Sequence, residues 1–203
     1  MSDARVPCAV VGDAPGRHPW VDWGGSGPAL HLAHANGFPP GTYRRLATAL
    51  SARFTVCSMG LRPLVPGADP GALARWEGLA ADIRSELRGR GLSGILGVGH
   101  SVGAVSSMMA SVEDPGLFRA LVLLDPVLFT GPRASVWGWM KRLGLSKRLP
   151  IVQGAIRRRD RWPSREDVLA SYRGKPLFAT WDPGCLEDYL DAVCEVLDAA
   201  NIT

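Results

Sequence analysis

The feature that most constrains the fold is the segment Gly99-His100-Ser101-Val102-Gly103, which fits the pattern G-x-S-x-G. An apolar run at 95–98 enters it, and a stretch of small and apolar residues follows it. This order predicts a strand, a sharp turn and a helix, with Ser101 on the turn in a strained backbone conformation. Gly99 and Gly103 would let neighbouring backbone pass close to that turn. Ser101 is therefore the candidate nucleophile, and the start of the following helix favours negative charge beside it.

A second constraining feature is the loop His34-Ala35-Asn36-Gly37-Phe38-Pro39, which follows an apolar run at 29–33. Gly37 gives the backbone freedom to turn back toward the candidate nucleophile. We expect the N–H groups of Phe38 and Val102 to face one spot, where they would hold a developing oxyanion. Donors of this kind contribute about 3–4 kcal/mol to transition-state stabilisation. A plain glycine turn is the alternative interpretation.

Short apolar runs alternate with helical patterns through the first part of the chain, which is typical of an α/β layer fold. The predicted strands are 9–11, 20–23, 29–33, 54–59, 95–98 and 118–125. The predicted helices are 42–52, a segment from Leu73 to near Gly89 or Gly91, and the segment after Ser101. After Pro126 the chain reads as helices broken by Gly and Pro and rich in Trp and Arg. The 203 residues therefore divide into a core at 1–126 and a helical cap subdomain at 127–203.

On these motifs the sequence resembles the α/β-hydrolase fold superfamily, in which a glycine loop, G-x-S-x-G and a further apolar strand follow in this order. The segments 34–41 and 124–129 look like those of bacterial hydrolases of the esterase and lipase-like type. The resemblance covers residues 6–126 and extends less specifically through the cap. It implies a mostly parallel sheet of about six strands with flanking helices. It also implies a serine hydrolase that forms an acyl-enzyme at Ser101 on a small apolar ester or related acyl substrate, with no cofactor and no metal.

The base that such a serine needs is absent from its usual place. In the family the triad histidine follows the last strand, yet the four histidines of this chain are His18, His31, His34 and His100. His100 adjoins the nucleophile, but its side chain should point away from it at a strand end, which favours packing over proton transfer. The resemblance gives His34 a loop-bracing role, and the other two belong to an early turn and a core strand. No triad histidine is identified.

Asp125 ends the strand at 118–125 and is either a displaced triad acid or a cap on the turn into Pro126, with the cap favoured. The last two strands of the family, which carry the usual acid and histidine, are missing, so we expect the sheet to end at a bare edge. Three interpretations stay open: a hydrolase truncated at its C-terminus, an inactive relative that keeps a binding pocket, or a site completed by a partner chain. The bare edge also predicts a homo-oligomer.

Charge and cysteine content add further expectations. The formal net charge is +4, with basic residues gathered between 141 and 161, but no recognition motif accompanies them, so no nucleic-acid partner is expected. Cys8, Cys57, Cys185 and Cys194 show no metal-ligand spacing and are expected to be reduced thiols. No segment has the apolar length of a signal peptide or a membrane span, which favours a cytoplasmic protein without a membrane partner.

Overall fold

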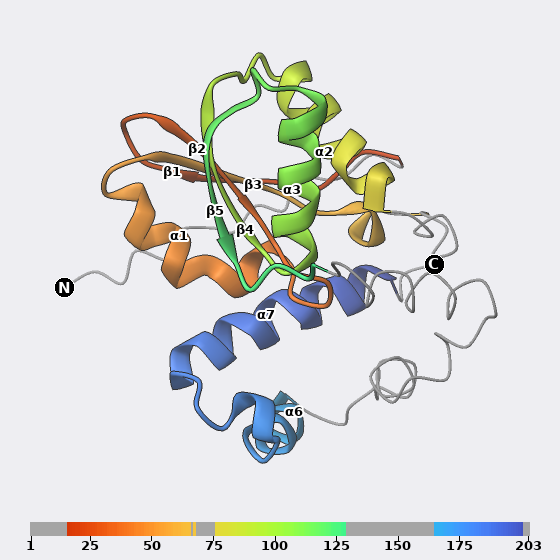
Figure 1. The fold of residues 1–203 in the computed structure, drawn as a ribbon. Helices are drawn as coiled ribbons and strands as arrows, with labels where there is room; N and C mark the ends of the chain where they lie inside the picture. The colour runs from red at the N-terminus through yellow and green to blue at the C-terminus, as the bar shows by residue number, and fades with distance from the viewer. Residues whose placement is uncertain (1–15, 66, 68–75, 129–164, 201–203) are drawn as a thin grey trace.

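The computed structural model describes residues 16–65, 67, 76–128 and 165–200. Within them, five strands form one sheet in the order β1-β3-β2-β4-β5 (Figure 1). β1 runs antiparallel to β3, and the other neighbouring strands are parallel. The strands are β1 (Trp20–Gly24), β2 (Ala29–Ala33), β3 (Thr55–Met59), β4 (Ile95–His100) and β5 (Phe118–Leu124). Parallel neighbours need crossover connections, so this sheet with its intervening helices is the α/β fold that the sequence predicts.

Helices connect the strands and continue after them. They are η1 (Pro40–Tyr43), α1 (Arg44–Ser51), η2 (Arg62–Leu64), α2 (Trp76–Gly89), α3 (Val102–Glu113), α6 (Arg165–Arg173), η5 (Pro176–Phe178) and α7 (Pro183–Ala200). The helix predicted over 42–52 is therefore divided into a 3-10 turn and α1. The 3-10 helix begins at Pro40, which has no N–H to donate and follows an extended residue, Pro39.

Two apolar cores lie on opposite faces of the sheet. On one face, α2 and α3 pack over strand residues that include Met59, Ile95 and Phe118. On the other face, α1 packs over Leu30 and its neighbours, and Leu96 of β4 belongs to this second core. Because successive strand residues point to opposite faces, Ile95 and Leu96 enter different cores although they are adjacent in sequence.

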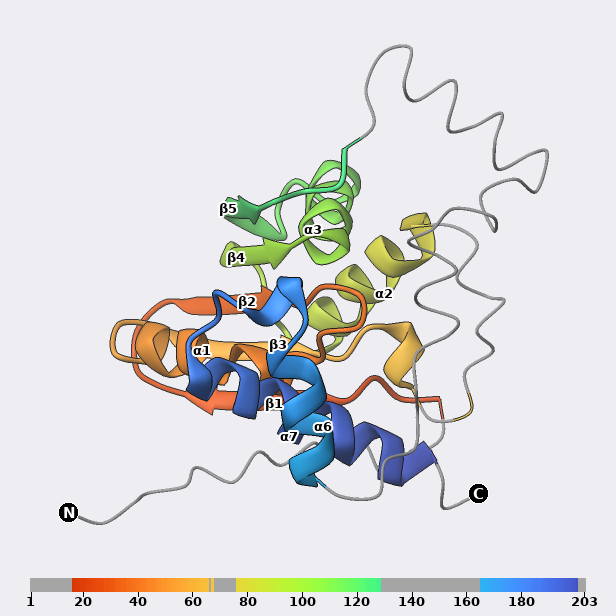
Figure 2. The same ribbon diagram turned by 90° about the horizontal axis from the view of Figure 1, so that it is seen from below.

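The C-terminal helices pack on the core at the side of the sheet where β2 leads into η1 (Figures 1 and 2). Gly41 allows this close approach, because a Cβ at that position would lie 2.7 Å from Ala192 Cβ of α7. Asp188 of α7 faces two arginines of α1, with Nε of Arg44 3.7 Å and Nε of Arg45 3.4 Å from its carboxylate oxygens. α7 is therefore held on α1 by both packing and charge.

The remaining predictions have different outcomes. The predicted strand at 9–11 and residues 129–164 of the predicted cap lie outside the described residues. In the described part of the cap, α6, η5 and α7 are helical, as the Gly- and Pro-broken pattern indicates. The boundary between core and cap stays a prediction, and α7 shares its apolar contacts with the core.

Candidate active site

Ser101 occupies the turn between β4 and α3, and its backbone has φ 53° and ψ −118°. Residues with a side chain rarely adopt this conformation, which costs on the order of 1–3 kcal/mol and persists only where the surroundings impose it. One such constraint is the Ser101 N–H, which donates to the Leu124 carbonyl at 2.9 Å and ties the turn to the end of β5. The strand, sharp turn and helix predicted around Ser101 are thus present, and the serine precedes the first residue of α3.

The glycines two positions either side of Ser101 lie against backbone, as the sequence predicts. A Cβ at Gly99 would lie 2.5 Å from Cα of Ala104, inside the first turn of α3. A Cβ at Gly103 would lie 2.5 Å from the His34 carbonyl oxygen and 2.6 Å from that of Ala33. Since backbone cannot yield as a flexible side chain does, both positions require glycine. The loop that follows β2 therefore packs directly on the start of α3.

That loop turns at Gly37, the residue expected to give its backbone freedom, and Gly37 has φ 77°. The Phe38 N–H donates to the Ala35 carbonyl at 3.1 Å and closes a tight turn. Val102, the second predicted oxyanion donor, is buried at the first position of α3. The oxyanion role of both residues stays a prediction. For Phe38 it requires that the N–H exchange the Ala35 carbonyl for a substrate oxygen.

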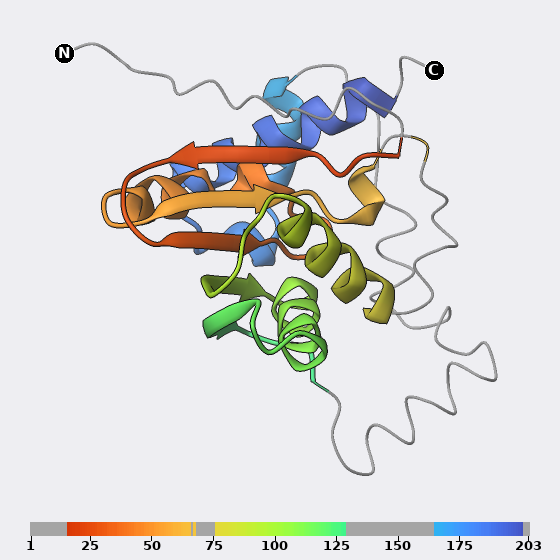
Figure 3. The same ribbon diagram turned by 90° about the horizontal axis from the view of Figure 1, so that it is seen from above.

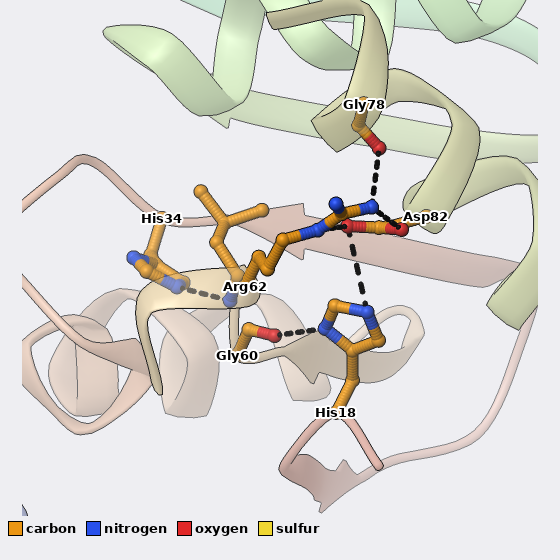
Figure 4. A network of polar contacts seen from close by, with 7 residues as sticks. His18, His34, Gly60, Arg62, Gly78 and Asp82 are labelled. Carbon is orange, nitrogen blue, oxygen red and sulfur yellow. Dashed lines mark hydrogen bonds and ion pairs between the residues drawn. The ribbon is translucent and has the colours of Figure 1, made fainter. Parts of the chain in front are cut away.

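His34 is buried and uses both ring nitrogens in hydrogen bonds, one of which is drawn in Figure 4. Nε2 accepts from the Leu61 N–H at 2.8 Å, which leaves the proton on Nδ1 to be donated to the Ala35 carbonyl at 2.8 Å. Burial lowers the pKa of His34 to about 4, so the ring is neutral at pH 7. With both nitrogens engaged, His34 has no lone pair left to take the proton of Ser101. Its contacts are those of a loop brace.

The side chain of His100 is hydrogen-bonded to Tyr43 and not to Ser101. The Tyr43 hydroxyl lies 2.7 Å from Nδ1 of His100 and also accepts the Ala35 N–H at 3.1 Å. Because its oxygen accepts from Ala35, the hydroxyl proton is free to be donated to Nδ1. Burial raises the pKa of Tyr43 to about 12, so the hydroxyl keeps that proton. Tyr43 thus joins the loop after β2 to the residue preceding Ser101.

The sequence predicts Tyr43 only as part of the helix at 42–52, so this role was missed. A tyrosine shortly after a glycine loop is the only local signal, and its partner His100 is distant in sequence. The pKa of His100 is lowered chiefly by burial, an effect that the charge of Asp125 partly opposes. Asp125 follows β5 with φ 43° and an exposed side chain, so it lies within electrostatic reach of the site. Its role as acid or cap stays a prediction.

The other two histidines are part of the scaffold. His31 of β2 is buried and stacks on Trp20, with ring centroids 6.4 Å apart, and burial lowers its pKa to about 3. His18 lies near Gly60, whose carbonyl accepts from its Nδ1 at 2.9 Å (Figure 4). Across the described residues, none of the four histidines hydrogen-bonds Ser101.

His18 also belongs to a charged cluster that the sequence pattern did not reveal. Its Nε2 is 3.6 Å from the Asp82 carboxylate, which receives two hydrogen bonds from Arg62, at 2.8 and 2.6 Å (Figure 4). Arg62 begins η2 and Asp82 lies in α2, so the cluster fastens the segment after β3 to that helix. The same segment contains Leu61, whose N–H is bonded to His34. The cluster therefore helps to fix the residue that holds His34 in place.

An aromatic cluster borders the other side of the loop. The Phe38 ring packs against Tyr189 of α7 and against Trp181, with ring centroids 5.3 and 5.9 Å apart. Phe178 of η5 and Tyr172 of α6 complete the cluster. The C-terminal helices therefore contact the predicted oxyanion loop through one of its own side chains.

A strained serine between a strand and a helix of a mostly parallel sheet, with a glycine loop packed against it, is the arrangement typical of the α/β-hydrolase fold. Comparison with known proteins agrees: a model of the alpha/beta hydrolase family matches residues 32–200. The chain belongs to this family.

Three relatives illustrate the range of the similarity. An abhydrolase domain-containing protein of Alternaria alternata is 38% identical over 93 residues, which are 46% of this chain and 30% of that protein. A type I acyl-CoA thioesterase of Penicillium roqueforti is 32% identical over 94 residues, which are 46% of this chain and 19% of the thioesterase. The crystal structure of E-2-(acetamidomethylene)succinate hydrolase superposes with a TM-score of 0.63 at 21% identity, covering 86% of this chain and 59% of that one. The chain thus matches less than a third of the length of these two sequence relatives, and the structural likeness shows the fold.

The described residues contain no group of three metal-ligating side chains. Among the helices that the structure describes, none is long and apolar enough to cross a membrane. Cys57 and Cys185 are free thiols, and burial raises the pKa of Cys57 to about 12. Cys57 is therefore a packed, unreactive side chain and not a second nucleophile.

Proposed function

We propose that the protein is a serine hydrolase that cleaves a carboxylic ester, or a related acyl compound such as a thioester, through an acyl-enzyme at Ser101. The observation that carries the proposal is the backbone of Ser101, which the packing of Gly99 and Gly103 holds in a strained conformation at the start of α3. Strain of this kind is retained at functional sites and has no value for stability. The thioesterase relative supports an acyl substrate.

In the proposed reaction, Oγ of Ser101 attacks the carbonyl carbon and the carbonyl oxygen becomes an oxyanion. The N–H groups of Val102 and Phe38 would stabilise this charge, after Phe38 releases the Ala35 carbonyl. The intermediate then expels the alcohol or thiol, and water hydrolyses the acyl-enzyme to return the serine and a carboxylic acid. An activated serine normally transfers its proton to a neighbouring base.

Proton transfer is the step that limits this chain. His34 is fully engaged and His100 is bonded to Tyr43, so water or hydroxide would take the proton from Ser101. We therefore expect slow acylation whose rate rises with pH and has no plateau near pH 6.5, where a histidine base would give one. Catalysis by an oxyanion hole and binding alone is roughly 10³–10⁴-fold over water.

The test is covalent labelling of the serine with a fluorophosphonate, read by intact mass, together with p-nitrophenyl ester hydrolysis. We expect one adduct on the native chain and none on Ser101→Ala. Ser111→Ala, which changes a serine of α3 away from the turn, is the matched control and should label normally. Equal labelling and equal ester hydrolysis by the native chain and Ser101→Ala would refute the proposal that Ser101 is the nucleophile of a hydrolase.

A second proposed function is a binding or interaction protein that keeps the fold without turnover. It is favoured by the one observation that no histidine in the described residues bonds Ser101. The two proposals differ in outcome: a binding protein would retain an apolar acyl ligand in equilibrium dialysis, equally well with Ser101→Ala, while forming no fluorophosphonate adduct. A cytoplasmic location is part of both proposals and is supported by the free thiols of Cys57 and Cys185.

A further inference from the structure

The segment from Phe38 to Pro40 is a stiff piece of backbone. Two consecutive prolines follow Phe38, and a proline disfavours the helical conformation for the residue before it. Pro39 itself is extended, with φ −60° and ψ 167°. On the other side of Phe38, Gly37 has φ 77° and is the conformationally free joint of the loop. Because the piece is stiff, a displacement of the Phe38 ring is passed on to the Phe38 N–H.

α7, which lies beside η1 and α1 (Figures 2 and 3), contacts this piece and the residue after it. The Tyr189 ring packs on the Phe38 ring, with centroids 5.3 Å apart. Ala192, three residues later and on the same face of the helix, lies against Gly41, where a Cβ would come within 2.7 Å of Ala192 Cβ. Trp181 also packs on the Phe38 ring, with centroids 5.9 Å apart. The position of Phe38 is therefore set by Trp181 and by one face of α7.

The Ala35 carbonyl, to which the Phe38 N–H is bonded, accepts two hydrogen bonds. One comes from the Phe38 N–H at 3.1 Å and the other from Nδ1 of His34 at 2.8 Å. A carbonyl oxygen has two lone pairs, so it can accept both. When the Phe38 N–H turns toward a substrate oxygen, the carbonyl keeps its bond to His34 and no buried acceptor is left without a partner. The exchange that the oxyanion role requires is therefore governed by where the stiff piece carries the N–H.

We propose that Trp181 and Tyr189 are positioning residues, which hold the Phe38 ring and thereby aim the Phe38 N–H at the oxyanion formed at Ser101. The proposal rests on the proposed function, because this aim matters only if Ser101 reacts. It differs from a role for the two rings as a wall of an acyl pocket. A wall contacts the acyl chain, so its loss affects long chains more than short ones, whereas a misplaced oxyanion donor slows the reaction equally for all chains.

The first measurement follows the Phe38 N–H itself and does not require Ser101 to react. The chain has five phenylalanines, so labelling them with 15N gives a simple amide spectrum, in which the signal missing from Phe38→Leu is that of Phe38. Its exchange with water should become faster in Trp181→Leu, because the bond to the Ala35 carbonyl opens more often when the ring is loose. Trp76→Leu is the matched control, since it makes the same change at a half-buried tryptophan of the other core, and the Phe38 amide should exchange as in the native chain.

The second measurement is the rate constant for labelling of Ser101 by a short-chain and by a long-chain alkyl fluorophosphonate. A misplacement of about 1 Å can cost about 10²-fold in rate, so Trp181→Leu should label ~10–100-fold more slowly, by the same factor with both probes. Phe38→Leu keeps the N–H but loses the ring, and should be slowed similarly. The double variant should be no slower than Phe38→Leu alone, because both changes remove the same contact. Trp76→Leu should label at the native rate.

The exchange and labelling results separate the alternatives. The proposal is overturned if Trp181→Leu leaves the exchange of the Phe38 amide unchanged, if its loss of labelling grows with chain length, or if the losses add in the double variant. An equal loss in Trp76→Leu would also overturn it, because general destabilisation would then account for the effect. If the native chain is not labelled at all, the proposed function is refuted and the positioning role falls with it, while the exchange result still reports on the ring contact. Circular dichroism checks folding, and Trp181→Phe replaces Trp181→Leu if the latter does not fold.

Discussion

Replacing Ser101 by glycine should stabilise the protein, although the same change in a helix destabilises. The φ of 53° and ψ of −118° at Ser101 match the first central position of a type II′ turn, which is a glycine position. Ser101→Ala keeps a Cβ and therefore keeps the strain, while Ser101→Gly removes it. The comparison of glycine with alanine at this one position isolates the backbone term, since both variants lack the hydroxyl.

The magnitude follows from two opposing terms. Relief of the strained conformation contributes about 1–3 kcal/mol to the stability of the glycine variant. The greater freedom of glycine in the unfolded chain costs about 0.4–1 kcal/mol. Ser101→Gly should therefore be more stable than Ser101→Ala by about 1 kcal/mol, which is ~2–4 °C in Tm for a chain of this size.

The assay is urea denaturation followed by circular dichroism, with Ser111 as the internal reference. Ser111 lies within α3, so Ser111→Gly should be less stable than Ser111→Ala by about 1 kcal/mol. The reasoning predicts opposite signs at the two positions. If glycine is the less stable residue at position 101 as well, then the turn holds no strain and the main support for a nucleophile is lost.

Three further outcomes are expected. Tyr43→Phe keeps the ring but leaves the partly buried Ala35 N–H without its acceptor. The free energy of unfolding, measured in urea, should therefore fall by about 1–3 kcal/mol. An unchanged urea midpoint would contradict the role given to the Tyr43 hydroxyl. His31 and His34 have pKa values of about 3 and about 4, below the unfolded value of 6.5. The contribution of these neutral histidines to the free energy of unfolding is therefore fully present above pH 6.5 and is lost as the pH falls. Between pH 6 and 4 the unfolding free energy should drop by up to ~2.7 kcal/mol per pH unit, and a slope that His31→Phe fails to reduce would count against this. Gly41→Val should detach α7 by collision with Ala192, seen as faster amide exchange in α7 alone, whereas global unfolding would show that α7 is part of the main cooperative unit.

Much of the fold could be predicted because its signals are local. The strand entering Ser101, the helix leaving it and the apolar strand β5 each follow from runs of a few residues. The elbow glycines were predictable for the same reason, since the pattern specifies where backbone must pass. The order of the strands and the position of α7 were not predictable from periodicity, because they depend on contacts such as Gly41 with Ala192 between distant segments.

The site was predictable in its parts and not in its connections. The family resemblance implies that His34 braces the loop, and the strand-end position of His100 predicts that it packs away from Ser101, but neither shows the partners of these histidines. Those partners, Leu61 and Tyr43, reach the histidines only through tertiary packing. The hydrogen bond from the Phe38 N–H to the Ala35 carbonyl could not be predicted either. In a glycine loop an N–H can point outward or bond a carbonyl of the same loop, and local composition does not distinguish the two.

The contact between Phe38 and the aromatic cluster has a consequence for the order in which the site is assembled. Phe38 leaves the ribosome long before Trp181 and Tyr189, on which its ring packs. Contacts of such long sequence separation form late in folding. The sheet with α2 and α3 can thus collapse around Ser101 first, while the loop beside it takes its final form only when α7 docks. The loop that carries Phe38 is therefore completed only after α7 has been synthesised and docked.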